Sequence, residues 1–383
     1  MTRHSVTPTP VMHVMRTYGV HGGERQLAQM FGENDGTAFA DHFCFLYRDD
    51  LCLRYFASIP GLRLHTLLSM KSRQFPSLTR ELVALFLLLP VLQIRLIATL
   101  AKIDTRICVA HGLQAGITCW LAACVMRKID FIYVHRGTKS RAGSLPVFKL
   151  LYWPFKAVAG VSQASAASLQ PLLMRGQTAI ALENGIDWRK IERQASACDH
   201  PPNRAFTVLA VGRLMTGKGQ ALIIEAFARF VSLTDVDARL VLAGDGPDEA
   251  MLKRIASERR VADRTIFLGA VQNIVCEFVN SEVFVHASEA EGLSNAVLEA
   301  MALQVPSVVV DAPGVTECHV QGETGFVVAR SADAMAEKLL VLAADPGLRE
   351  RMGRCAQKRV QTEYSIGSNL ARYHQMYAQL GAV

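Results

Sequence analysis

Two carboxylates, Glu291 and Glu299, stand eight residues apart in the segment 291–302, which reads EGLSNAVLEAMA. The segment follows a short apolar strand, and Ser294 or Asn295 can cap the helix that it begins. The N-terminus of such a helix offers free N–H groups and the positive end of its dipole to an anion. Carboxylates on either side of that anion are good acceptors for sugar diols. The spacing predicts a nucleotide-sugar site, and a capped helix with Glu299 in a structural ion pair is the alternative.

Two cations leave the end of another predicted strand, Phe206 to Val211. Arg213 and Lys218 are five residues apart, and Lys218 stands at the start of the next helix. A guanidinium fork and a lysine point charge at a helix start suit a diphosphate. We interpret the pair as a diphosphate clamp, with ordinary surface cations as the alternative.

A glycine loop follows the first buried strand, Val11 to Tyr18. Gly22 and Gly23 lie in this loop, and a helix is expected over 26–31. Strand, glycine loop and helix together present backbone N–H groups to a phosphate or carboxylate. The loop is neither GxGxxG nor a Walker A sequence, because no GK[ST] follows. A glycine turn without a ligand is the alternative.

Two histidines, His111 and His135, each stand just past a predicted strand of the first half. Open α/β sheets bind their ligands at the carboxyl ends of the strands. We therefore expect His135 to face a ligand and regard His111 as a weaker candidate, since a single histidine is more often a structural residue.

Strands and helices alternate along the whole chain, which is typical of parallel sheets covered by helices. A length of 383 residues indicates two α/β domains. We expect a first domain over 1–187, a polar linker over 188–204, a second domain over 205–362 and a final helix over 363–383.

Cysteines and apolar segments bear on location. The nine cysteines form no CxxC and no cluster with zinc-ligand spacing, so we expect reduced thiols in the cytosol. The polar N-terminus does not resemble a signal peptide. The most apolar segment, 82–101, is interrupted by Pro90, Gln93 and Arg95. We expect it to be a buried or surface-lying helix, broken or kinked near Pro90, rather than a membrane span.

Positive charge is concentrated in the first half of the chain. Residues 1–187 contain 20 Lys/Arg and 11 Asp/Glu, whereas residues 188–383 contain 21 and 23. The densest part, 127–156, mixes basic residues with the aromatic segment KLLYWPFK at 149–156. This mixture suits an anionic membrane surface or a lipid-linked substrate, and a solvated basic face is the alternative. No nucleic-acid-binding signature is present.

Several motifs together resemble glycosyltransferase family 4. They are the Glu-x7-Glu motif of Glu291 and Glu299, VGRL followed by KG at 211–219, AGDGP at 243–247 and PGVTECHVQGETGFVV from Pro313. The resemblance is tight over about 205–330. It is looser in the first domain, where GGER at 22–25, the strand ending in His135, and ENGID at 183–187 agree with family positions.

The resemblance implies the GT-B fold, which is α/β with two facing Rossmann-like doubly wound domains and a C-terminal helix that crosses back to the first. It also implies a role for each matching residue. Glu299 would hold the ribose and Glu291 the donor sugar, while Arg213 and Lys218 clamp the diphosphate without a metal. The amides of Gly292, Leu293 and Ser294 would assist, His135 would line the sugar side, and Gly22, Gly23 and Asn184 would line the phosphate or acceptor side.

This chain departs from the family pattern at two points. Ala287-Ser288, preceded by His286, replaces the usual Pro-Ser before the first glutamate, and the glycine loop is one residue shorter than in many members. The shorter loop removes the basis for assigning a role to Glu24 or Arg25.

The leading hypothesis is a retaining glycosyltransferase without a cofactor. It would move a sugar from a nucleotide-diphosphate donor to a glycan or lipid-linked acceptor in lipopolysaccharide, capsule or exopolysaccharide synthesis, at the cytoplasmic face of a membrane. The alternative is a non-catalytic GT-B protein that binds a nucleotide sugar as a sensor or partner subunit. A nicotinamide-dependent dehydrogenase is excluded by the lack of GxGxxG after any strand.

Overall fold

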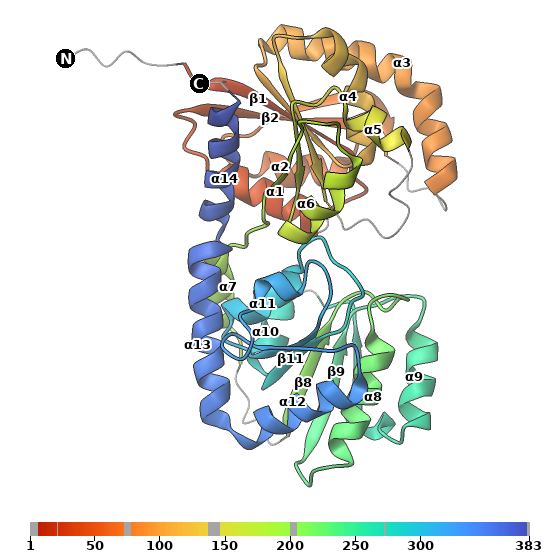
Figure 1. Ribbon diagram of the computed structural model, residues 1–383, viewed down its shortest axis with the longest axis vertical. Coiled ribbons are helices and arrows are strands. Elements are labelled where there is room, and N and C mark those ends of the chain that lie inside the picture. Colours follow the sequence, from red (N-terminus) through yellow and green to blue (C-terminus); the bar gives the residue numbers. More distant parts are fainter. Residues whose placement is uncertain are drawn as a thin grey trace, which may run out of the picture. The chain divides into compact units, whose positions relative to one another are not determined.

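A computed structural model describes residues 7–20, 22–72, 78–136, 146–199, 205–271 and 273–380. The chain forms two compact units (Figure 1). The first comprises residues 1–185 together with 366–383, and the second comprises residues 186–365. Each unit contains one sheet in which every paired strand is parallel.

The first sheet has seven strands in the order β3-β2-β1-β4-β5-β6-β7. Chain order reverses between β1 and β4, which makes this point the topological switch of a doubly wound sheet. The strands are β1 (Thr9–Met15), β2 (Phe39–Arg48), β3 (Arg63–Lys71), β4 (Ile107–His111), β5 (Asp130–His135), β6 (Ala157–Gly160) and β7 (Ala179–Ala181).

Helices cover both faces of this sheet. They are α1 (Gly22–Gly32), α2 (Asp50–Ala57), α3 (Leu78–Ile103), α4 (Leu113–Val125), α5 (Pro146–Tyr152), α6 (Gln163–Leu169) and the 3-10 turn η1 (Gln170–Leu172). Side chains alternate along β1: Met12 and Val14 pack with α3 and α4, while Val11 and Met15 pack with α1 and α2. The strands are therefore apolar on both faces, as expected for a parallel sheet with helices on each side.

The last helix, α14 (Ile366–Gln379), belongs to the first unit. Tyr373 and Tyr377 are buried in the cluster that also contains α1 and α2. At the end of β7, the carbonyl of Glu183 accepts a hydrogen bond from Asn369 Nδ2, and its carboxylate pairs with Arg372 Nε at 2.9 Å. The helix is thus held by both apolar burial and polar contacts to ENGID.

The second sheet has six strands in the order β10-β9-β8-β11-β12-β13. Its switch point lies between β8 and β11, where Val208 pairs with Val283. The strands are β8 (Phe206–Val211), β9 (Ala238–Ala243), β10 (Thr265–Gly269), β11 (Val283–His286), β12 (Ser307–Val310) and β13 (Phe326–Val328).

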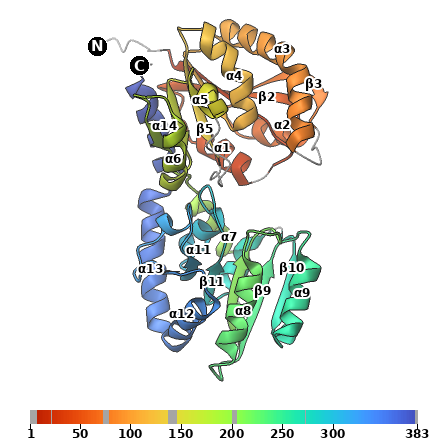
Figure 2. The same cartoon turned by 45° about the vertical axis from the view of Figure 1, so that its right-hand side comes forward.

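The helices of the second unit surround one continuous apolar core. Two of them, α8 and α9, run side by side (Figure 2). The elements are α7 (Trp188–Ala195), α8 (Gln220–Val231), α9 (Glu249–Glu258), η2 (Ala262–Arg264), α10 (Ile274–Val279), α11 (Asn295–Ala302), η3 (Thr316–Cys318), α12 (Ala332–Ala344) and α13 (Pro346–Glu363). The expected fold class, α/β with two Rossmann-like doubly wound domains, is confirmed.

The linker predicted over 188–204 is wrong in its first part, which forms helix α7 within the second unit. Helix α7 has no fully buried residue, but Trp188 and Ile191 pack partly buried against the core of the second unit. Cys198, just beyond it, forms a disulfide with Cys276 in α10. The remainder of the predicted linker, 200–204, lies outside the described residues.

The expectation that all nine cysteines are reduced is wrong for this disulfide pair. The other seven are free thiols, and five of them are buried. Burial raises the pKa of Cys44 and Cys318 far above the ordinary thiol value and that of Cys52 to about 12. These three are therefore protonated core residues rather than nucleophiles.

The apolar segment 82–101 lies within α3, which continues through Pro90 without a break. Of the break or kink expected near Pro90, the break is wrong, whereas Figure 1 shows the helix bending along its length. Leu85, Leu92 and Leu96 are fully buried on its inner side. Within it, Val83–Ile103 is the described segment long and apolar enough to span a membrane, with 22% of its most apolar window buried. The core helix of a soluble protein can be equally long and apolar.

Glycines allow the loops at the carboxyl edge of the second sheet to touch. A Cβ on Gly219 would overlap the carbonyl oxygen of Ala287, and one on Gly314 would overlap that of Glu291. Both glycines have positive φ, +78° and +74°. A side chain at either position would push apart the loops after β8, β11 and β12.

We predict that Gly219→Ala lowers the free energy of unfolding of the second unit by about 3 kcal/mol or more. The left-handed backbone alone costs alanine about 1–2 kcal/mol, and the overlap with Ala287 adds to this. Gly269→Ala is the matched control, because Gly269 has φ +67° but open space around its Cβ position. Urea denaturation curves measure both changes. Equal losses in the two variants would show that the loops do not pack as closely as described.

Candidate active site in the second unit

The predicted clamp residue and the first glutamate meet at the switch point of the second sheet. Lys218 follows β8 and Glu291 follows β11, and these strands are hydrogen-bonded neighbours. Lys218 Nζ lies 2.7 Å from Glu291 Oε1, with side chains 30% and 18% exposed. Residues 73 positions apart in sequence are therefore brought together where α/β sheets bind ligands.

His286, which ends β11, completes this cluster. Its Nε2 lies 3.4 Å from both Glu291 Oε1 and Ser294 Oγ, and the imidazole is buried. Burial alone would raise the pKa of Glu291, but hydrogen bonds from His286 and Lys218 and the charge of Lys218 hold it at about 2. Glu291 is therefore an anion at every physiological pH and acts as an acceptor, not as an acid.

Helix α11 follows this cluster, as predicted, with Ser294 as its N-cap and Ala302 as its last residue. Glu299 lies in the middle of the helix and is half-buried. The amide of Ser294 donates to the carbonyl of Gly314 at 3.2 Å. The expected role of this amide toward phosphate stays a prediction, and a phosphate would have to share its hydrogen with the loop after β12 or replace that contact. Gly292 and Leu293 lie in the turn just before it.

Arg213 also follows β8, as expected, and its side chain is exposed. Its backbone is fixed, because its carbonyl accepts a 2.8 Å hydrogen bond from Gln220 Nε2 at the start of α8. A flexible guanidinium on a fixed backbone beside Lys218 can adapt to an anionic group.

The residues predicted in the first unit lie at the carboxyl edge of its own sheet. His135 ends β5, and its Nδ1 lies 3.4 Å from Tyr133 Oη. Asn184 follows β7, and its backbone N–H donates to the carbonyl of Val161. Gly22 and Gly23 are the first residues of α1, so the expected loop over 22–25 and helix start at Gln26 are wrong. The arrangement still places a helix N-terminus at this edge.

A buried polar network at this edge was missed by sequence reasoning. His13 in β1 lies 3.1 Å from both Asp41 in β2 and His111 at the end of β4. His111 Nδ1 lies 3.4 Å from the guanidinium of Arg136. Burial first, and then the charge of Arg136, lower the pKa of His111 well below its usual value. His111 is therefore neutral near pH 7, and its two ring nitrogens contact His13 and Arg136.

No sequence pattern marks this network, because its members are 28 and 98 residues apart. Its only signal is that three of the residues stand inside or at the end of strands that read as apolar. A polar residue within such a strand must find a partner on a neighbouring strand.

Solved structures with similar folds place both units in the GT-B class. A glycosyltransferase from Rickettsia africae aligns with a TM-score of 0.78 at 16% identity, covering 98% of this chain and 99% of that one. HepE of Anabaena in complex with UDP aligns with a TM-score of 0.75 at 18% identity, covering 98% and 100%. At these identities the likeness establishes the fold alone.

The sequence of the second unit is similar to those of known glycosyltransferases. Residues 193–359 match the family described as "Glycosyl transferases group 1". N-acetyl-alpha-D-glucosaminyl L-malate synthase of Bacillus anthracis is 30% identical over 156 residues, 40% of each chain. The capsular polysaccharide biosynthesis glycosyltransferase CapM of Staphylococcus aureus is 29% identical over 192 residues, 48% of this chain and 49% of that one. The match thus spans half or less of these curated relatives, and the second unit carries the glycosyltransferase group 1 likeness.

A buried histidine, His319, lies in the loop between β12 and β13. Burial lowers the pKa of His319 to about 4, opposed by a hydrogen bond with the backbone of Thr324. An imidazole whose pKa is lower in the folded than in the unfolded state stabilises the fold fully only above its unfolded pKa of about 6.5. That stability is lost as the pH falls from 6.5 towards 4.

We predict that the free energy of unfolding falls by up to about 3 kcal/mol between pH 6.5 and pH 4 on account of His319. Denaturation midpoints at half-unit pH steps measure the slope, and His319→Gln should make it shallower because glutamine does not titrate. The other buried histidines contribute equally to both proteins. Identical slopes in the two would contradict the burial of His319.

Proposed function

We propose that this protein is a retaining glycosyltransferase of family 4 that uses a nucleotide-diphosphate sugar. The observation that carries the proposal is the contact between Lys218 and Glu291 at the switch point of the second sheet. Glu291 stands eight residues before Glu299, which lies on α11. It supplies a cation for the diphosphate and an ionised carboxylate for sugar hydroxyls. The likeness of residues 193–359 to glycosyl transferases group 1 supports the same assignment.

Each residue has a role in the proposed donor complex. Arg213 and Lys218 hold the diphosphate, and the amides of Gly292, Leu293 and Ser294 at the start of α11 assist them. Glu299 accepts hydrogen bonds from the ribose hydroxyls, and Glu291 from the hydroxyls of the donor sugar. His286 keeps Glu291 oriented and ionised. In the first unit, His135 faces the donor sugar, and Gly22, Gly23 and Asn184 face a phosphate or the acceptor.

The reaction breaks the bond between the sugar and the diphosphate. Negative charge develops on the leaving phosphate, and the preorganised cations Arg213 and Lys218 stabilise it there without a metal. The acceptor oxygen forms the new bond on the same face of the sugar, and its proton passes to the leaving phosphate. The configuration at the anomeric carbon is therefore retained.

We predict that one of the nucleoside diphosphates UDP, GDP and ADP raises the melting temperature of the full chain, whereas the monophosphate CMP, the control, does not. Glu299→Ala should weaken its binding about tenfold to a hundredfold, because a hydrogen bond to a charged group contributes about 1.5–3 kcal/mol. Thermal shift identifies the nucleotide, and calorimetric titration gives the dissociation constants.

The matched control is Glu258→Ala, which removes an exposed carboxylate of α9 in the same unit and should leave binding unchanged. Absence of any shift, or equal binding by Glu299→Ala, would make the glutamate pair structural. Binding without transfer to any saccharide would favour a nucleotide-sugar-binding protein without catalysis.

We further propose that the enzyme works on a glycan or lipid-linked saccharide at the cytoplasmic face of a membrane, in surface-polysaccharide synthesis. CapM, a capsular polysaccharide enzyme, and LpsE of Rhizobium meliloti, a lipopolysaccharide core enzyme, are among its relatives. The exposed side of α3 supports the proposal that the protein binds a membrane surface. Its exposed apolar side chains are Val83, Phe86, Leu87, Val91 and Ile94.

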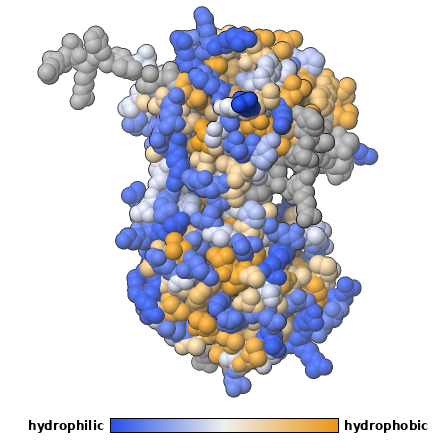
Figure 3. All heavy atoms as spheres, viewed as in Figure 1, coloured by the Kyte–Doolittle hydropathy of each residue, from blue (hydrophilic) through white to orange (hydrophobic). Residues whose placement is uncertain are grey.

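The neighbouring helices extend this apolar face and add charge. Trp120 of α4 donates its indole N–H to the carbonyl of Leu150 in α5 at 2.9 Å, and Leu150 and Trp153 are more than half exposed. The exposed cations nearest in sequence are Arg127, Lys128, Lys149 and Lys156. Orange atoms on the upper right of Figure 3 lie over α3. An apolar face with basic residues around it suits an anionic bilayer surface.

We predict that the protein cosediments with vesicles of phosphatidylglycerol and phosphatidylcholine more than with phosphatidylcholine alone. Replacing Leu87 and Ile94, which are 78% and 67% exposed, by glutamate should reduce the partition coefficient about tenfold or more, because each buried leucine-sized side chain contributes about 1.5–3 kcal/mol. Leu233→Glu, at an exposed position of the second unit, is the control. If the partition coefficient changed neither with the lipid charge nor in the variant with both substitutions, a membrane-binding surface on α3 would be contradicted.

A further inference from the structure

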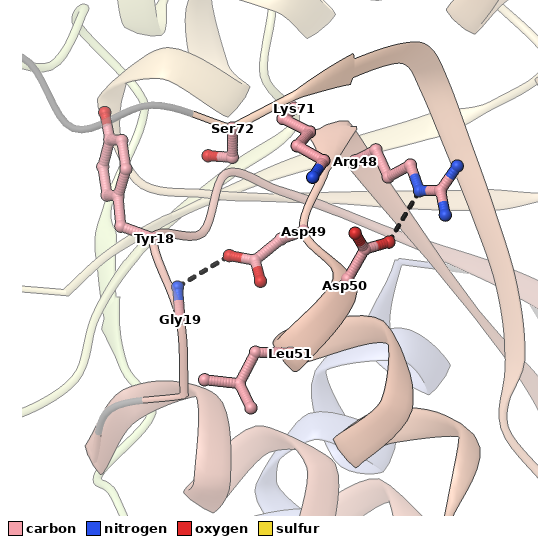
Figure 4. A pocket seen from close by; sticks show the side chains of 8 residues that line it. All are labelled: Tyr18, Gly19, Arg48, Asp49, Asp50, Leu51, Lys71 and Ser72. Carbon is pink, nitrogen blue, oxygen red and sulfur yellow. Dashed lines mark hydrogen bonds and ion pairs between the residues drawn. The ribbon is translucent and has the colours of Figure 1, made fainter.

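A pocket of about 280 Å³ opens at the carboxyl ends of β1, β2 and β3, within the first unit (Figure 4). Its walls come from the segment after β1, the start of α2 and the end of β3. It is lined chiefly by Tyr18, Arg48, Asp49, Asp50, Leu51 and Lys71. The volume lies just below the range of about 300–1,000 Å³ typical of ligand pockets, which suits a single ring. None of these residues belongs to the sites assigned above.

The frame of the pocket is held by hydrogen bonds. Asp49 caps α2 by accepting from the amide of Cys52 at 3.0 Å, and its other oxygen accepts from the amide of Gly19 at 2.6 Å. Ser72 Oγ donates to the carbonyl of Thr17 at 2.6 Å. These contacts join the loop after β1 to both α2 and β3. A ligand would therefore meet walls that are already in place, which reduces the entropy lost on binding.

One aromatic wall is fixed in the same way. The guanidinium of Arg16 lies 4.6 Å from the ring centre of Tyr18 and 4.6 Å from that of Tyr47. Tyr18 is thus stacked on a cation whose other face is covered by Tyr47. Leu51, 55% exposed, provides a second apolar surface and lies below Asp49 in Figure 4.

The charges that line the pocket balance. Arg48 Nε pairs with Asp50 Oδ1 at 2.6 Å, and this hydrogen bond lowers the pKa of Asp50, so the pair is ionised. The charge of Lys71 adds to the lowering of the pKa of Asp50. The second carboxylate, Asp49, accepts from the amides of Cys52 and Gly19 and from Thr17 Oγ1. A phosphate or carboxylate ligand would gain from Lys71 but would be repelled by Asp49 and Asp50. The lining favours a neutral ligand.

A neutral ligand that uses this lining must carry several hydroxyl groups and an apolar face. Its hydroxyls can donate to the carboxylates and accept from Lys71. Its C–H face can rest on the ring of Tyr18 or on Leu51. A pyranose ring has these properties, whereas a nucleotide phosphate or a fatty acyl chain does not.

We propose that this pocket binds one neutral sugar ring of the acceptor saccharide. The identification of the sugar as acceptor rests on the proposed glycosyltransferase function, while binding of a neutral sugar to the pocket does not. The first sheet then offers two places on its carboxyl edge. The ends of β4 and β5, with His135 and Arg136, lie on one side of β1, and the sugar pocket lies on the other, at β2 and β3.

Saturation-transfer difference NMR on the full chain tests the proposal. The probes are the methyl α- and β-glycosides of glucose, galactose, mannose and N-acetylglucosamine, each at millimolar concentration, with inorganic phosphate as an anionic competitor. Leu51→Trp fills the pocket from an exposed position, so folding should be unaffected. Leu233→Trp makes the same change at a 51% exposed position of the second unit. Lys71→Met removes the ammonium group that can donate to a ligand in the pocket.

We expect transfer to at least one glycoside in the wild type and in Leu233→Trp, loss of the signal in Leu51→Trp, and at least a threefold weaker signal in Lys71→Met. Phosphate should not compete. No transfer to any glycoside, an unchanged signal in Leu51→Trp, or displacement by phosphate would overturn the proposal.

Titration of the same samples with the nucleoside diphosphates separates this proposal from the proposed function. Nucleotide binding that depends on Glu299, together with absent glycoside binding, would overturn the sugar pocket alone. Glycoside binding that depends on Leu51, without any nucleotide binding, would keep the pocket and overturn the transferase.

Discussion

The second unit depends on the close approach of backbone loops at one edge of its sheet. Gly219 meets the carbonyl of Ala287, Gly314 meets that of Glu291, and Gly244 meets that of Gly212, each at a distance that leaves no room for a Cβ. Lys218 and Glu291 project from these loops and contact each other at 2.7 Å. The charged groups are therefore positioned by steric contact between main chains. Side-chain pairing alone would leave long, flexible residues such as lysine poorly placed.

Much of the second unit could be predicted from sequence because its signals are local. The segment 291–302 combines a glycine turn, a capping residue and a periodic apolar pattern, and the helix found at Asn295–Ala302 has the expected cap and end. The ionisation of Glu291 could be predicted only in part. His286 ends β11 beside it, and nothing in the sequence shows that the imidazole contacts the carboxylate.

The first unit was harder to predict for two physical reasons. Strand β3 lies at the edge of its sheet, and most of its side chains are at least partly exposed, so its sequence lacks the apolar run of a central strand. Helix α2, also missed, has only eight residues, which is too short for a clear amphipathic pattern. Both elements line the sugar pocket, so that pocket could not be seen in the sequence. In the second unit, the disulfide Cys198–Cys276 could not be predicted either, since the spacing of cysteines does not reveal which of them pair.

The path of the chain has a consequence for how the protein is made. The first unit needs α14, whose Tyr373 and Tyr377 fill the core beside Phe31 and Phe39. The second unit, 186–365, is complete before α14 is synthesised. At about 5–20 residues per second, a ribosome needs roughly 10–40 s to pass from the last strand of the first unit to its last helix. The domain that emerges first is thus the last to be completed, because its aromatic core lacks Tyr373 and Tyr377 until the final helix has been synthesised.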